Sequence, residues 1–234
     1  MGKIKITLPD NSVREYHKGV TVLEVAKDIS EGLARVAVGA VVNGKTKGLQ
    51  ETIDEDAQVR IVKFEDKEGK EIFWHTSAHI MALAVQRLFP DVKFAIGPAI
   101  EDGFYYDFDT EHRFTPEDLE KIEEEMKKIV KENHTLERFI MPRDEALEYF
   151  KEKGEIYKVD LIESFPEDEE ISFYKLGEFT DLCAGPHLLN TKKVKAIKLL
   201  SIAGAYWRGD EKNKMLPRIY GVTFEKQKEL DAYF

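Results

Sequence analysis

The 234 residues contain a single cysteine, Cys183, so the chain cannot form an internal disulfide. This excludes a secreted scaffold held together by disulfides, and we expect a cytoplasmic protein. The sequence also lacks any apolar run of the roughly 18 to 20 residues that a membrane-spanning helix needs. Its first residues, MGKIKITLPDNS, contain no apolar signal-peptide core. No membrane contact is therefore expected.

Positive charge is in the minority, because 35 Lys and Arg stand against 45 Asp and Glu for a net charge of -10. This excludes a protein coated in positive charge for nucleic acid. The basic residues gather between Lys192 and Arg218, where eight Lys or Arg accompany only two acids. Such a local segment can hold a phosphate backbone on an acidic protein. Charges that simply face solvent would give the same pattern.

Residues 1 to 64 have the pattern of a small mixed domain. KIKITL alternates as a strand, and a capping box at Thr21 and Glu24 opens a helix. The β-rich stretches ARVAVGAVV and QVRIVKF follow. Two strands, one helix and further strands predict a ubiquitin-like β-grasp fold. This domain contains no cluster of catalytic residue types.

Residues 39 to 46, GAVVNGKT, match the phosphate-binding pattern G-x-x-x-x-G-K-[ST]. That chemistry needs a flexible turn followed directly by a helix. Here three strand-forming residues precede an Asn-Gly turn, and nothing helical follows, so we expect a hairpin. Nucleotide hydrolysis at this loop remains a third hypothesis, which requires ATP or GTP binding that depends on Lys45.

The polar stretch EDKEGKE falls in a predicted linker, residues 65–72, before a larger α+β domain at 73–224. WHTSAHIMALAVQRLF is apolar almost all round, which predicts a buried helix that ends before Pro90. TPEDLEKIEEEMKKIVKEN predicts a surface helix capped by Thr115, and PRDEALEYFKEKG a shorter one. FYKLGEFTDLCAGP and VKAIKLLSIAG are strand-like. Residues 225–234 begin a last helix.

Four residues able to bind a metal or act as nucleophile and base occur in two pairs. His75 and His79 stand four apart on the buried helix, so both imidazoles can share one face. Cys183 and His187 form the second pair, with Gly185 between them. The spacing leaves three chemistries open: a closed structural zinc site, a cysteine nucleophile activated by histidine, or a metal-free pocket that orients water.

Five blocks together resemble the N-terminal half of bacterial-type threonyl-tRNA synthetases: HTSAH, FAIGPAIEDGFYYDFD, GEIYKVDLI, FTDLCAGPH and AGAYWRGDEKNKMLPRIYG. The resemblance runs through nearly the whole chain. It implies that the first domain is similar to the TGS module of that family. It also implies that the second is similar to the editing domain, which hydrolyses serine from mischarged threonine tRNA. Alanyl-tRNA editing domains have a related set of residues that binds zinc, whereas the threonyl version works without a metal.

The resemblance also implies a set of site residues. The editing pocket would be lined by His75, His79, Cys183, His187, Lys158 and Asp181. His75 and Lys158 would position and activate a water, and Asp181 would recognise the amino or hydroxyl group of serine. The other three would fix the terminal ribose and the pocket shape. Taken without the resemblance, Lys158 would be an ordinary surface lysine, and for Asp181 a turn cap is the alternative to a site residue.

Aromatic and basic residues complete the expected site. Tyr105, Tyr106 and Tyr206 are candidates for stacking on the terminal adenosine, with a place in the core as the alternative. The candidates for contact with tRNA phosphates are Lys192, Lys193, Lys195, Lys198 and Arg208. The partner implied by the resemblance is the 3′ end of tRNA(Thr) carrying serine.

The resemblance implies no cofactor for editing, although zinc at the His/Cys cluster stays possible in principle. ATP and zinc would belong to an aminoacylation domain, which we do not recognise in these residues, so we expect this polypeptide not to charge tRNA. We expect part of a longer, homodimeric synthetase rather than a free-standing editing protein. The alternative function is a zinc-stabilised, non-catalytic tRNA-binding module.

Overall fold

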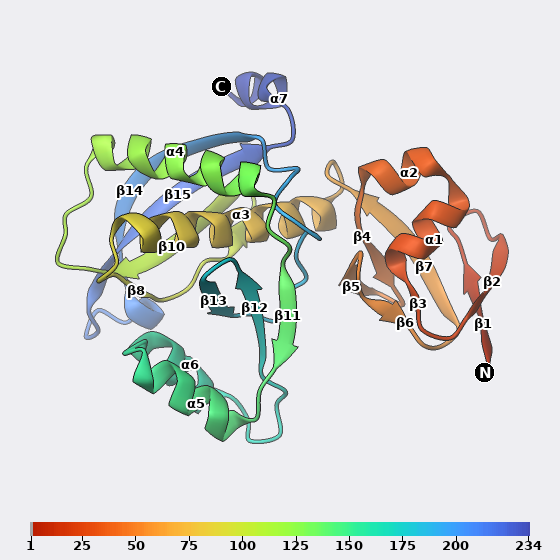
Figure 1. Cartoon of the computed structure of the whole chain (residues 1–234), viewed down its shortest axis with the longest axis horizontal. Helices are drawn as coiled ribbons and strands as arrows, with labels where there is room; N and C mark the ends of the chain where they lie inside the picture. The colour runs from red at the N-terminus through yellow and green to blue at the C-terminus, as the bar shows by residue number, and fades with distance from the viewer. Residues whose placement is uncertain (1) are drawn as a thin grey trace. The chain divides into compact units, whose positions relative to one another are not determined.

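Residues 2–234 are described by a computed structural model, in which the chain divides into two units after Phe73. The first unit comprises the residues up to Phe73 together with Gly185–Leu189. The second comprises Trp74–Ala184 together with Asn190–Phe234. Each unit contains both helices and strands (Figure 1), which confirms the expected α+β class.

The first unit has the predicted β-grasp architecture. In chain order its elements are β1 (Lys3–Thr7), β2 (Val13–His17), β3 (Val20–Thr21), α1 (Val22–Ile29), α2 (Glu31–Val36), β4 (Ala37–Val42), β5 (Lys45–Gly48), β6 (Thr52–Ile53) and β7 (Ala57–Lys63). The main sheet has the order β2-β1-β7-β4-β5, in which β1 and β7 are parallel. Helix α1 packs its apolar side against this sheet, where Val22 and Val25 join Ile4 and Ile6 in the core.

Local signals explain where the helices of this unit begin. The capping box is present: the Thr21 hydroxyl accepts from the Glu24 amide at 3.1 Å, and the Glu24 carboxylate accepts from the Thr21 amide at 3.2 Å. Helix α2 was not expected, because its last residues belong to the β-rich ARVAVGAVV. Ser30 caps this helix by accepting from the Leu33 amide, so the strand starts only at Ala37.

GAVVNGKT forms the expected hairpin. Gly39 to Val42 lie in β4 and Lys45 begins β5, while Asn43 and Gly44 adopt φ angles of 48° and 81°. Positive φ at both turn residues is the geometry of a two-residue hairpin loop. Because β5 and not a helix follows the turn, the loop lacks the helix N-terminus that a phosphate-binding loop requires.

The expected linker is largely helical. Helix α3 (Lys67–Leu88) begins inside the range 65–72, so most of that stretch is not an extended connection. The polar sequence does not reveal where the helix starts, because Lys and Glu are common in linkers and are also good helix formers. Glu68 also forms an ion pair with Arg60 at 2.8 Å, which holds this first turn.

The second unit contains two sheets. Its elements after α3 are β8 (Lys93–Phe94), β9 (Ala99–Ile100), β10 (Gly103–Asp109), α4 (Pro116–Glu132), β11 (Glu137–Ile140), α5 (Arg143–Glu152), α6 (Ile156–Ser164), β12 (Ser172–Leu176), β13 (Phe179–Leu182), β14 (Ala196–Tyr206), a short 3-10 turn (Trp207–Gly209), β15 (Met215–Phe224) and α7 (Gln227–Tyr233). The larger sheet has the order β14-β15-β10-β8, with β9 on β10, and the smaller has the order β11-β12-β13.

Helices α3 and α4 are visible together in front of the larger sheet (Figure 1). From Ala78 to Val85 every residue of α3 is buried, as the apolar sequence predicts. Arg87 near its end donates to Glu125 and Glu132 of α4 and to Glu178 before β13. Helix α4 begins at Pro116 after the predicted Thr115 cap. No helix within residues 2–234 is long and apolar enough to cross a membrane.

Candidate functional site

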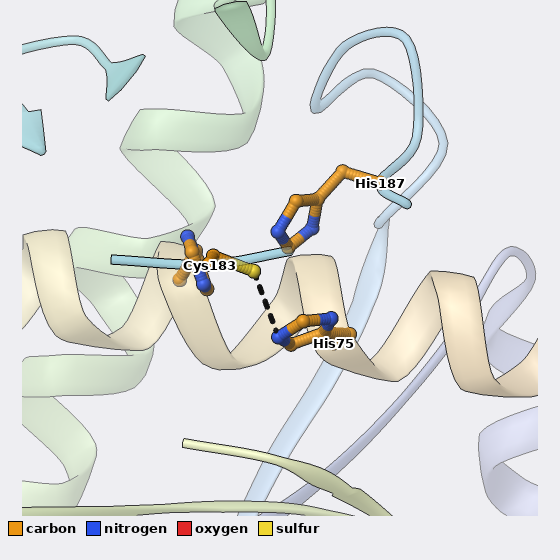
Figure 2. A group of neighbouring side chains, drawn as sticks. His75, Cys183 and His187 are labelled. Carbon is orange, nitrogen blue, oxygen red and sulfur yellow. Dashed lines mark hydrogen bonds between the residues drawn. The ribbon is translucent and has the colours of Figure 1, made fainter. Parts of the chain in front are cut away.

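Helix α3 places His75 and His79 one turn apart on the same face. Their ring centroids are 5.3 Å apart, and His79 is buried while His75 is partly exposed. Cys183 follows directly after β13, and its Sγ lies 3.3 Å from Nε2 of His75 (Figure 2). With His187, these residues form a group whose four ligating atoms all lie within 4.8 Å of one another. The two sequence pairs therefore meet.

A buried ion pair lies beside this group. Asp181 of β13 and Lys158 of α6 have side chains only 4% exposed, and Lys158 Nζ is 2.5 Å from Asp181 Oδ1. The same ammonium group donates to the carbonyl of Ala95 at 2.6 Å and to the hydroxyl of Tyr106 at 3.0 Å. Tyr106 in turn donates to Asp181 Oδ2 at 2.8 Å, and His79 Nε2 lies 3.4 Å from that oxygen. Lys158 is thus not a surface lysine.

The surroundings keep Asp181 ionised despite its burial. Burial alone would raise the pKa of this carboxyl, but the positive charge of Lys158 outweighs it, aided by His79 and Tyr106, so the pKa of Asp181 is lowered. Burial raises the pKa of the Tyr106 hydroxyl well above its usual value, and the negative charge of Asp181 acts in the same direction. Tyr106 is therefore a hydrogen-bond donor at neutral pH.

Both histidines of α3 are neutral at pH 7. Burial lowers the pKa of His75 to about 3, and His79 adds to this while Asp181 opposes it. Burial lowers the pKa of His79 to about 4, against the effect of Asp181 and together with that of Lys158. Neutral imidazoles can accept hydrogen bonds or bind a metal through a ring nitrogen.

The donor set fits zinc. Three imidazoles and one thiol are the ligand types that zinc prefers, and bonds of about 2.0–2.3 Å place tetrahedral ligands roughly 3.5 Å apart. The four donor atoms, which lie within 4.8 Å of one another, need only side-chain adjustment to reach that spacing. A site in which all four bind leaves no open position for a catalytic water.

The three candidate tyrosines lie in different environments. Tyr106 is fully buried with its ring against Phe108 and Phe94, so it is a core residue rather than a stacking surface. Tyr105 precedes it in β10 and faces the opposite side of the sheet, where its ring lies 3.7 Å from the Arg218 guanidinium. Tyr206, at the end of β14, is 40% exposed.

The basic candidates are spread along residues 192–208, and some of them are half-buried or form ion pairs. Lys192 and Lys195 are exposed, whereas Lys193 is half-buried and burial lowers its pKa. Lys198 lies 3.7 Å from Glu123, and Arg208 pairs with Asp160 at 2.9 Å. The ion pairs of Lys198 and Arg208 are made to acids other than Asp181.

Two polar groups of the site were not expected from sequence. One is the Tyr106 hydroxyl as a donor to Asp181, and the other is the Ala95 carbonyl as an acceptor for Lys158. Alternation in FYYDFD could have indicated the first, because Tyr106 shares a face with Phe104 and Phe108. No sequence signal marks a particular backbone carbonyl.

Gly97 gives the Tyr106 ring its space. A Cβ at this position would lie 2.0 Å from Cδ2 of Tyr106, far closer than non-bonded carbon atoms approach one another. We expect Gly97→Ala to displace the ring and lower the free energy of unfolding by about 1–3 kcal/mol, as overpacked cores do. Both tryptophans, Trp74 and Trp207, belong to the second unit, so their fluorescence during urea unfolding measures this change.

Gly204→Ala is the matched control, since the atoms nearest to its Cβ would be those of the flexible, exposed side chain of Met215. Equal stability of the two variants would contradict the packing role of Gly97.

Two known family models match parts of this chain. A family model described as "TGS domain" matches residues 4–63. A second, described as "Threonyl and Alanyl tRNA synthetase second additional domain", matches residues 171–220, which include Asp181, Cys183 and His187. Lys158, His75 and His79 lie outside the matched range.

Curated relatives match almost the whole chain. A threonine–tRNA ligase of Finegoldia magna is 63% identical over 229 residues, which are 98% of this chain and 36% of the relative. The enzyme of the same name from Clostridioides difficile is 64% identical over 230 residues, again 98% of this chain and 36% of the relative. A third, from Caldanaerobacter subterraneus subsp. tengcongensis, is 64% identical over 228 residues. The chain thus spans about a third of the length of these relatives.

Proposed function

We propose that this chain, which is similar over almost its whole length to threonine–tRNA ligases, is part of such an enzyme and that its second unit hydrolyses serine from mischarged tRNA(Thr). The observation that carries this proposal is the buried Lys158–Asp181 ion pair beside His75 and Cys183. Burying two charges is costly, and such pairs are typical of sites that do chemistry.

The limits of a binding pocket explain the need for such a reaction. Threonine exceeds serine by one methyl group, and one such group contributes only about 1–3 kcal/mol to discrimination. A separate hydrolytic site corrects the remaining errors if it admits serine and excludes threonine by size. In our proposal the side chains around the Lys158–Asp181 pair perform that exclusion.

Hydrolysis here needs an oriented water and stabilisation of negative charge. Water adds to the acyl carbon, the bond from that carbon to the ribose oxygen breaks, and the ribose hydroxyl gains a proton that the water loses. In this proposal the ammonium group of Lys158 stabilises the oxyanion that develops on the acyl oxygen. Asp181 would accept a hydrogen bond from the amino or hydroxyl group of serine.

His75 is suited to orient the water rather than to retain its proton. A general base works best with a pKa near the operating pH, and burial holds the pKa of His75 at about 3. A ring nitrogen of the neutral imidazole can still accept a hydrogen bond and fix the water's position. The other members of the cluster, His79, Cys183 and His187, shape the pocket and bound the ribose.

The direct test compares tRNA(Thr) charged with serine and with threonine. We expect the chain to hydrolyse the seryl ester at least about 100-fold faster than buffer does. The threonyl ester should react more slowly by roughly 10- to 200-fold, the range that one methyl group allows. A seryl-tRNA half-life equal to that in buffer would rule out the proposed activity.

The donor set of His75, His79, Cys183 and His187 favours one competing function, a zinc-stabilised RNA-binding module without catalysis. Bound zinc would hold the cluster closed and stabilise the fold. The two functions predict opposite results for protein that is exposed to a chelator and then checked for metal by mass spectrometry. We expect seryl-tRNA hydrolysis to be unchanged by chelation. Tightly held zinc without turnover would support the module.

A further inference from the structure

Helix α6 carries Lys158, but its own sequence provides few of the features that stabilise a helix. It spans only Ile156–Ser164, and Glu155 at its N-cap makes no capping hydrogen bond. Its first turn contains no acidic residue that would favour the helix dipole. Helices this short are marginal in water, so contacts from elsewhere in the fold must fix its position. Those contacts decide where the ammonium group of Lys158 lies.

The tip of the β14–β15 hairpin, residues 207–214, contacts Tyr157 and Asp160, which flank Lys158 in the sequence. Asp160 accepts from the indole N–H of Trp207 at 2.8 Å and from Nε of Arg208 at 2.9 Å. Arg208 also donates to the backbone carbonyl of Asp160 at 3.2 Å. The ring of Tyr157 packs edge-on against Trp207, with centroids 4.9 Å apart.

Trp207 also shares a cluster with Ala95, whose carbonyl is a hydrogen-bond partner of Lys158. It is buried in a cluster with Tyr157, Leu216 and Ala95, and the Ala95 carbonyl is an acceptor for Lys158. The indole therefore packs against Tyr157 of the helix that carries the ammonium group, and it shares a cluster with the residue that receives one of the hydrogen bonds of that group. A shift of this side chain would disturb both at once.

The backbone of the tip is held in an uncommon conformation. Arg208 has a φ of 56°, which a residue with a side chain adopts only where its surroundings enforce it. Trp207 is tied back across the hairpin, because its amide donates to the Lys214 carbonyl and its own carbonyl accepts from the Asn213 side chain. Lys214 also lies 2.7 Å from Asp109, which accepts from the Tyr157 hydroxyl.

From these contacts we propose that the hairpin tip is a positioning element for Lys158, acting through the bonds of Trp207 and Arg208 to Asp160. The polar contacts of Trp207 and Arg208 with α6 are made to Asp160 and not to Lys158 itself. It fixes α6 so that Nζ of Lys158 stays between Asp181, Tyr106 and Ala95. The catalytic consequence rests on the proposed function, since only there does the position of this ammonium group set a rate.

The primary test measures the position of Lys158 without any activity. The folded chain is treated briefly with acetic anhydride, and acetylation of Lys158 is quantified by peptide mass spectrometry. A paired, buried lysine reacts slowly, so Asp160→Ala should raise its acetylation rate by about tenfold through easier local opening. Glu163→Ala, an exposed position on the same helix, is the matched control and should leave the rate unchanged.

A second variant covers the case in which Asp160→Ala does not fold. Trp207→Phe removes the indole donor but keeps a ring against Tyr157, and it should raise the acetylation rate by a smaller factor. Asp160→Asn retains an acceptor for the indole and should restore most of the protection. Wild-type protection of Lys158 in a folded Asp160→Ala or Trp207→Phe chain would overturn the proposal.

Kinetics separate this proposal from the proposed function. If the chain hydrolyses seryl-tRNA, Asp160→Ala should lower kcat by about tenfold or more while KM changes little, since a small misplacement of a catalytic group has effects of this size. If the wild-type chain does not hydrolyse seryl-tRNA, the proposed function fails, and the acetylation result still decides the positioning role. An unchanged kcat in a variant with exposed Lys158 would contradict the catalytic link.

Discussion

Replacing Lys158 by methionine is expected to lower the free energy of unfolding of the second unit by about 3–5 kcal/mol. The reason is that Asp181, the ion-pair partner of Lys158, remains in the variant. Asp181 is 4% exposed on its side chain and would keep a buried charge without the ammonium group that offsets it. Ala95 and Tyr106 would each lose a hydrogen bond as well. Urea unfolding followed by tryptophan fluorescence measures this loss.

The double variant Lys158→Met with Asp181→Asn separates charge from packing. Asparagine retains an oxygen that can accept from Tyr106 but carries no charge. Replacing both members of a buried ion pair is often close to neutral, so the double variant should recover most of the lost stability. A double variant as unstable as the single one would show that the ion pair is not the source of the effect.

Replacing His75 by alanine is expected to have the reverse profile, a large loss of activity with little loss of stability. His75 is partly exposed and neutral, so its removal strands no charge, and a change of about 1 kcal/mol is typical of such positions. Loss of the group that orients the water should slow seryl-tRNA hydrolysis by about 100- to 10,000-fold. Single-turnover hydrolysis with labelled seryl-tRNA measures this.

Two further variants sharpen that result. His75→Gln keeps a hydrogen-bond acceptor near the position of the ring, and partial activity in it would indicate orientation rather than proton storage. His17→Ala removes an exposed histidine of the first unit and should behave as wild type. Full activity in His75→Ala would remove this residue from the mechanism.

The parts of the fold that the sequence predicted are those with strong local signals. The helix from Pro116 follows a capping residue, and α1 follows a capping box. Helix α3 was evident from its apolar sequence, although its polar first turns gave no helical signal of their own. Helix α6 gave no such signal, because it is short, lacks a cap and buries a lysine. Its existence depends on contacts with distant residues.

In the candidate site, too, only the features that follow from local sequence rules were predictable. The spacing of His75 and His79 places both on one helix face, which a local rule covers. Their meeting with Cys183, more than one hundred residues away, is set by the packing of β13 against α3, and the resemblance rather than the spacing indicated it. The burial of Lys158 contradicts the usual behaviour of lysine, and only its pairing with Asp181 explains it. Such pairing cannot be read from either residue alone.

The most direct measurement is the rate of seryl-tRNA(Thr) hydrolysis by the wild-type chain and by the Lys158→Met, Asp181→Asn double variant, at equal concentration and with both shown to be folded. We predict rapid hydrolysis by the wild type and only the spontaneous rate with the double variant. Equal hydrolysis by both would place the reaction outside this buried site.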